Sequence, residues 1–135
     1  MSRVTVRDIG WSQIKADSAK LTSYVLEFGL FEDAGEHDGI PFAQIGFWQE
    51  YGTVDIPARP WLSGGARFTE RAAMRQITSI VNRIGKLPNN PEQLLKPLAK
   101  AIARGIQDYA LNGPFVPNAE STEKQKGFNL SLIHI

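Results

Sequence analysis

Side chains that could carry acid–base or nucleophilic catalysis are few in this chain. Its only histidines, His37 and His134, lie far apart in the sequence, and cysteine is absent. A Ser–His–acid triad assembles in space, so sequence distance alone leaves such a triad open. However, the chain has no nucleophile elbow, no glycine-rich phosphate loop and no zinc-type spacing of histidines. We therefore expect a protein without enzymatic activity, catalytic residues or a cofactor.

An acidic stretch beside His37 is the best candidate for a metal site. Its carboxylates are Glu32, Asp33, Glu36 and Asp38. Carboxylates and imidazoles bind divalent cations, but the order of these residues does not follow the alternating acidic positions of a calcium-binding loop. Residues 32–39 contain two glycines and have no hydrophobic periodicity, which is typical of a solvated connection. We predict a mobile polar loop here and no metal site.

A row of arginines with a spacing of four residues could contact phosphate groups. Arg67, Arg71 and Arg75 fall on one side of a helix at this spacing. Glu70 lies beside the row, and no aromatic platform of a nucleic-acid-binding module accompanies it. We therefore favour an exposed helix face, which could also meet an acidic protein neighbour. Nucleic-acid binding or regulation through this face is the alternative function.

Residues 47–62 form a stiff, turn-rich stretch that is the most unusual part of the chain. It contains four aromatic residues, two prolines, one glycine and one arginine. Pro57 and Pro60 fix their own φ angles and favour extended conformations for the residues before them. The Arg59 guanidinium can donate to carboxylates or carbonyls, and Trp61 can anchor a core or an interface. These residues alone leave internal packing and docking equally open.

The hydrophobic pattern predicts the elements that lead into this stretch. Residues 24–31 alternate strictly and predict the best strand of the chain, with one face made of Tyr24, Leu26, Phe28 and Leu30. A shorter strand is indicated at residues 4–6. Helices are predicted at residues 11–21 and 43–51, and Gly52 suits a left-handed position at the end of the second.

Two longer helices are predicted in the second half of the chain. The first runs from about residue 66 to 84, after Ser63-Gly64-Gly65, and Gly85 stops it. The second begins with Asn90 as N-cap and Pro91 at its first position, and it ends before Gly113-Pro114. Pro97 lies inside this pattern and predicts a kink or a broken first turn.

Composition places the chain among small globular proteins. It has 135 residues, of which 42% are hydrophobic and 21% charged, and a formal net charge of +1. This length fits one domain over residues 1–135, and the near-neutral charge gives no general reason to expect nucleic acid or an acidic membrane as partner. We find no signal sequence and no apolar stretch long enough to span a bilayer. The elements predict an α+β fold in which a small antiparallel or mixed sheet packs on about four helices.

The motifs resemble those of phage tail-completion proteins, the virion morphogenesis or tail-component family of long-tailed phages and prophages. The resemblance is carried by Glu50-Tyr51-Gly52-Thr53 with Ile56-Pro57-Ala58-Arg59-Pro60-Trp61-Leu62, and by a second signature at Gly113-Pro114-Phe115-Val116-Pro117-Asn118-Ala119 with Ser121-Thr122. Order and spacing agree from about residue 20 to residue 127. Two separated motifs in the right order are more specific than either alone.

The chain departs from the family pattern at a few positions. Gln49 stands where the family often has Asn, Trp61 where it usually has Phe, and Ser63 where Arg is common. The end of the chain, residues 131–135, replaces the segment that normally leads into closing strands and is similar to a translated sequencing adapter. We therefore expect the C-terminus to be truncated and those strands to be lacking.

The resemblance implies a structural protein of the virion tail or neck, assembled in the cytoplasm of a bacterial host. It would act at tail completion or head–tail joining as one subunit of a ring, with neck or tail-tube proteins as neighbours and neither a membrane nor nucleic acid as partner. Docking would be its mechanism. The residues assigned to the assembly interface are Trp48, Tyr51, Gly52, Thr53, Ile56, Pro57, Ala58, Arg59, Pro60, Trp61, Arg67 and Arg71.

Overall fold

The computed structural model describes residues 2–5, 7 and 10–116. Within these ranges the chain forms four α-helices and one two-stranded antiparallel sheet, so the α+β class is confirmed in its coarse form. The end of the chain, which we expect to be truncated, lies outside the described residues. The elements are α1 (Trp11–Thr22), a 3-10 turn η1 (Glu32–Ala34), β1 (Glu36–His37), β2 (Ile40–Pro41), α2 (Phe42–Tyr51), α3 (Trp61–Val81) and α4 (Glu92–Asn112).

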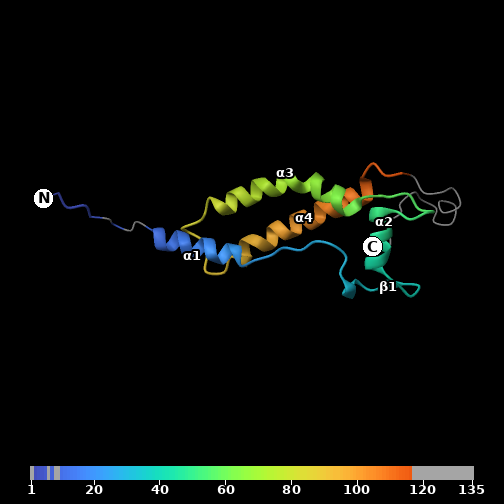
Figure 1. Cartoon of the computed structure of the whole chain (residues 1–135), viewed down its shortest axis with the longest axis horizontal. Coiled ribbons are helices and arrows are strands. Elements are labelled where there is room, and N and C mark those ends of the chain that lie inside the picture. Colours follow the sequence, from blue (N-terminus) through green and yellow to red (C-terminus); the bar gives the residue numbers. More distant parts are fainter. Residues whose placement is uncertain (1, 6, 8–9, 117–135) are drawn as a thin grey trace.

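Helices α3 and α4 lie antiparallel and side by side, and they form the long axis of the molecule (Figure 1). Small residues let the two backbones approach closely. A Cβ atom on Gly65 would lie only 2.9 Å from the Cα of Ile106, and the Cβ of Gly105 would overlap the Thr69 side chain. The Thr69 hydroxyl donates to the Gly65 carbonyl at 3.0 Å, so this polar side chain is satisfied although it is buried.

Helix α3 begins at Trp61, and the prediction that it starts near residue 66 is wrong. The Ser63-Gly64-Gly65 sequence suggested a loop because glycine weakens helices by about 1 kcal/mol relative to alanine. Here the glycines lie within the first turns of α3, where they allow contact with α4. Contact with a neighbouring helix thus outweighs local propensity.

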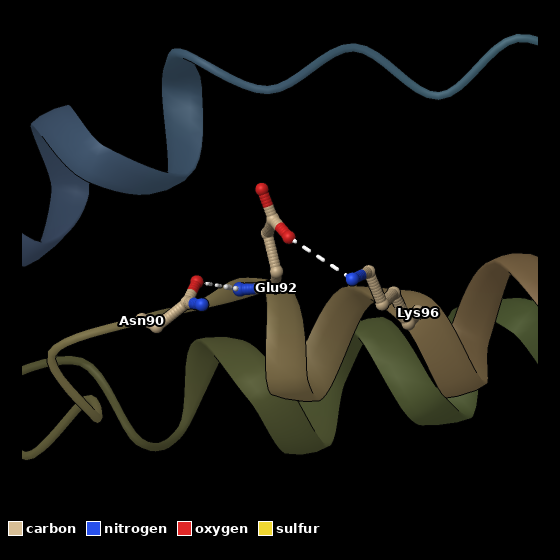
Figure 2. A network of polar contacts seen from close by, with 3 residues as sticks. All are labelled: Asn90, Glu92 and Lys96. Atoms are coloured by element: carbon tan, nitrogen blue, oxygen red, sulfur yellow. Dashed lines mark hydrogen bonds and ion pairs between the residues drawn. The ribbon is translucent and has the colours of Figure 1, made fainter.

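The start of α4 follows the sequence closely (Figure 2). The Asn90 Oδ1 accepts a hydrogen bond from the Glu92 N–H at 3.1 Å, and Pro91 already has helical dihedral angles. Glu92 pairs with Lys96 one turn later at 3.2 Å. Helix α4 runs on through Pro97 without interruption, so the expectation of a broken first turn is wrong.

Helix α1 forms where it was predicted, but its buried side chain is a carboxylate. Asp17 is fully buried and accepts hydrogen bonds from the backbone N–H of Gly85 at 2.8 Å and of Leu87 at 3.2 Å. The Gln13 amide donates to its other oxygen at 2.7 Å. Asp17 therefore fastens α1 to the connection between α3 and α4, at the far end of the molecule from α2 (Figure 1).

The predicted strand at residues 24–31 is wrong. This stretch runs without regular secondary structure beside the helices, and residues 25–30 make no backbone hydrogen bond with the described residues. The described residues 2–5 and 7 form no strand either, while Val6 lies outside the description. An alternating pattern makes a strand only where a second edge pairs with it.

The only sheet in the described ranges is a tight hairpin that begins inside the predicted polar loop of residues 32–39 and ends just after it, at Pro41. Glu36 pairs with Pro41 and His37 with Ile40. Its two-residue turn is Asp38-Gly39, in which both residues have positive φ angles, 51° and 79°. Asp-Gly is one of the strongest short-range hairpin signals, and the sequence interpretation missed it.

The core is small. Among the described residues only Trp61, Leu98 and Ile106 are buried hydrophobic side chains. Six partly buried residues pack around Trp61 and Ile106, namely Phe28, Leu30, Leu62, Ile102, Ala110 and Phe115. Seventeen large hydrophobic side chains of the described part are exposed, from Val4 to Val116. No helix of the described ranges is long and apolar enough to cross a membrane.

Candidate assembly interface

The first half of the sequence motif is a tight turn that only glycine can make. Gly52 ends α2 with a φ of 77°, as its place predicted, but its ψ of 173° lies outside the left-handed helical region. A Cβ atom here would lie 2.8 Å from both the Ala58 nitrogen and the Ile56 oxygen. Thr53 closes the turn, because its N–H donates to the Ile56 carbonyl and its hydroxyl accepts from the Ile56 N–H. The turn therefore brings Ala58 back against the end of α2.

Glu50 provides the cap that the start of α3 needs. Its two carboxylate oxygens accept the backbone N–H groups of Leu62 at 2.8 Å and Ser63 at 3.1 Å. These N–H groups belong to the first turn of α3, where the helix has no partner for them and its dipole favours negative charge. Pro60 precedes the helix and offers no side-chain cap of its own. Glu50 thus holds α2 and α3 together.

Arg59 is buried, with 4% of its surface exposed. Its Nε donates to the Val116 carbonyl at 2.8 Å and its Nη1 to the Gln49 side chain at 3.4 Å, while its backbone N–H donates to the Gln49 carbonyl. Burial lowers the pKa of the Arg59 guanidinium below its ordinary value. Arg59 therefore joins the first sequence signature to the second, which includes Val116.

Trp61 is a core anchor. It is 7% exposed, and its Nε1 donates to the Gly46 carbonyl at 2.9 Å. Gly46 must lack a side chain, because a Cβ there would lie 2.6 Å from Leu30 Cδ1 and 3.2 Å from Trp61 Cζ2. The sequence left internal packing and docking equally open for this stretch. Arg59 and Trp61 are both buried, so their role is internal packing. Residues 46–63 form an interlocked connection that we call the clasp.

An open apolar groove lies beside the clasp, between residues 28–31, α2 and α3, and its volume is about 990 Å³. Its most exposed large apolar side chains are Phe31, Phe47, Tyr51 and Met74, which are 50–69% exposed, and Ile77 is 36% exposed. The rings of Phe47 and Tyr51 contact one another with centroids 4.8 Å apart. Phe47, Phe31 and Met74 were missing from the predicted interface, since nothing in their spacing distinguished them from core residues.

The arginine row borders this groove. Arg67, Arg71 and Arg75 are exposed on α3, and they line a second hollow that shares Arg67, Glu70 and Met74 with the groove. No ion pair within the described ranges involves these arginines. The remaining predicted interface residues lie on or around the turn. Thr53, Pro57, Ala58 and Pro60 are exposed, and Trp48, Gly52 and Ile56 are half-buried.

Candidates for chemistry are sparse in this part of the chain. His37 is exposed, and its Nε2 lies 3.4 Å from the carboxylate of Asp38. Searched over the described residues, no group of three or more acidic or histidine side chains could hold a metal ion. His134 lies outside these residues.

No protein-family model, no curated protein and no solved structure matches this chain. Function is therefore inferred from the two sequence motifs and from the geometry of the clasp, the groove and the arginine row.

Proposed function

We propose that this protein is a structural subunit of a phage or prophage virion that acts at tail completion or head–tail joining as part of a ring. The two sequence signatures of the tail-completion type support this proposal. They are brought together by the Arg59 Nε–Val116 O hydrogen bond of 2.8 Å.

The observation that carries the proposal is the imbalance between core and exposed apolar surface. Three hydrophobic side chains are buried in the described part, while seventeen large ones are exposed. Soluble monomers rarely expose large contiguous apolar patches, and such patches mark protein–protein contacts. Five of these side chains line the groove. A subunit of this kind is stabilised when a neighbour covers the groove.

The clasp gives this groove a rigid wall. Phe47 and Tyr51 project from the last turns of α2, whose end is fixed by Gly52 and by the Glu50 cap on α3. A preformed surface loses little conformational entropy on binding, so more of the contact energy appears as affinity. The motif thus acts in docking by holding the aromatic side chains in place, while Arg59 and Trp61 support them from inside.

The proposal predicts that the full chain self-associates through the groove. Sedimentation velocity and electron microscopy should show closed oligomers, and Phe47→Asp with Tyr51→Asp should dissociate them. Val54→Asp with Leu111→Asp is the matched control, because both residues are exposed apolar side chains outside the groove lining. In the encoding phage, the groove variant should leave heads and tails unjoined. A wild-type chain that stays monomeric alone and with neck or tail-tube proteins refutes the proposal.

The exposed arginine row supports a second candidate, a prophage-derived binding module for nucleic acid. Arg67, Arg71 and Arg75 form no ion pair with other described residues and could contact phosphates. DNA affinity that falls steeply with salt, and falls again in Arg71→Glu with Arg75→Glu, would support this candidate. Absence of binding at low salt would remove it.

A further inference from the structure

The subunit carries two exposed, separate patches of opposite charge. The acidic patch is η1 with the hairpin β1–β2, which we call the acidic hairpin, and every residue from 32 to 40 is exposed. Its carboxylates are Glu32, Asp33, Glu36 and Asp38. The basic patch is the arginine row of α3, with Glu70 as its one acidic neighbour. Figure 1 shows the hairpin beyond α2, on the edge of the molecule opposite to α3.

The two patches do not pair with each other within one copy. Among the described residues the ion pairs are His37–Asp38 in the hairpin and Glu92–Lys96 in α4, and neither joins the hairpin to α3. Exposed guanidinium and carboxylate groups that cannot reach each other in one subunit can meet between two subunits. Complementary patches of this kind steer association and fix its orientation.

We infer that the acidic hairpin of one copy docks on the arginine row of a second copy, at the rim of the apolar groove. This inference rests on the proposed self-assembly and names the surfaces that carry it. The arginine row and the groove share Arg67, Glu70 and Met74, so one docking event covers both. Ile40, which is 36% exposed in the hairpin, supplies an apolar side chain that meets the groove.

The geometry of such a contact decides the type of assembly. The hairpin and the arginine row are different surfaces, so the contact is heterologous. The copy that contributes its hairpin keeps a free arginine row, and the copy that contributes its arginine row keeps a free hairpin. Repetition of a heterologous contact gives a ring when the rotation closes. The positive φ angles of Asp38 and Gly39, 51° and 79°, make a tight turn that presents the carboxylates from a short hairpin.

Charge exchange tests the contact. The first variant is Arg71→Glu with Arg75→Glu, and the second is Glu32→Lys with Glu36→Lys; all four residues are exposed. Each variant alone should weaken self-association about tenfold or more, because like charges then face each other. A mixture of the two variants should assemble, since the native hairpin of one meets the native arginine row of the other, and the reversed patches also attract.

Lys100→Glu with Arg104→Glu in α4 is the matched control. It changes the net charge as much as the arginine variant does, and both residues are exposed and line neither the groove nor the second hollow. Sedimentation velocity on the full chain at about 0.05 M and about 1 M salt should show that the native contact weakens with screening. Circular dichroism should show unchanged helix content in every variant.

The outcomes separate this inference from the proposed function. Oligomers that are insensitive to salt and to both charge variants overturn the docking of the hairpin but leave self-assembly standing. A wild-type chain that remains a 15.0 kDa monomer under all conditions overturns both. If the arginine variant and the hairpin variant are both folded but fail to assemble when mixed, the contact between the acidic hairpin and the arginine row is overturned. An assembly that stops at two copies overturns it as well.

Discussion

Removal of the Glu50 carboxylate tests whether the clasp holds α2 and α3 together. In the folded chain this carboxylate accepts two N–H groups of the first turn of α3, at 2.8 Å and 3.1 Å. Loss of an N-terminal cap costs about 0.5–2 kcal/mol, and the helix dipole adds roughly 0.3–1 kcal/mol for a negative charge at this place. We expect Glu50→Ala to lower the free energy of unfolding by about 2 kcal/mol.

Two further variants sharpen this prediction. Glu50→Gln keeps one acceptor oxygen but loses the charge and the second acceptor, so it should cost about 1 kcal/mol. Glu70→Ala is the control, because Glu70 is an exposed acid of α3 that forms no ion pair with other described residues. A surface change of this kind should stay within about 0.5 kcal/mol of the wild type.

Chemical unfolding followed by circular dichroism measures these differences, at one protein concentration because association also stabilises the fold. Hydrogen exchange gives the local readout. The Leu62 and Ser63 amides should lose protection in Glu50→Ala and keep it in Glu70→Ala. If Glu50→Ala unfolds within about 0.5 kcal/mol of the wild type and both amides keep their protection, the carboxylate does not hold the start of α3.

Three other changes probe the remaining contacts. Gly52→Ala should destabilise the chain by more than about 1 kcal/mol, because φ is 77° and the Cβ would meet backbone atoms at 2.8 Å, whereas Gly29→Ala, with open space around it, should not. Burial alone would raise the pKa of Asp17, but hydrogen bonds from Leu87, Gln13 and Gly85 and the charge of Lys20 hold it below 3.8. The ionised Asp17 carboxylate therefore stabilises the fold above its unfolded pKa, and this stabilisation is lost as the pH falls through its lower folded pKa. In Asp17→Asn, acid unfolding should lack the loss of stability that comes from protonating this carboxylate. Arg59→Lys should lose roughly 1.5–3 kcal/mol in urea unfolding, since a lysine cannot reproduce the Nε and Nη1 contacts, and wild-type stability in this variant would contradict the internal role of Arg59.

Local signals were sufficient for much of the helical structure. The pattern at residues 11–21 predicted α1 within one residue of its observed end at Thr22, and capping preferences at Asn90-Pro91 predicted the start of α4 within one residue of Glu92. Gly52 was recognised as the end of α2 because only glycine adopts positive φ at little cost. The Asp-Gly turn was equally local and could have been recognised.

Tertiary contacts decided the rest, because the partners are distant in sequence. Nothing in its local sequence marks Asp17 for burial, yet its buried carboxylate accepts hydrogen bonds from backbone N–H groups 68 and 70 residues away. Residues 24–31 alternate like a strand but have no neighbouring strand among the described residues to pair with, and the pattern within those residues could not show this. Arg59 and Trp61 were assigned to the assembly interface from the sequence. In the structure both are buried, because Arg59 donates to the Val116 carbonyl and Trp61 to the Gly46 carbonyl.

The sequence by itself determined that four helices form, the stiff turn at Gly52 and the types of residue in the motif, since those depend on local dihedral and capping preferences, although the start of α3 depended on its contact with α4. Only the tertiary structure decided which motif residues face inward and which remain exposed. Hydrogen-bond partners for Glu50, Arg59 and Trp61 had to be available across the clasp before their polar groups could be buried without a large cost. Phe47 and Tyr51 were left on the outside, and they are the part of this surface that a neighbour can cover.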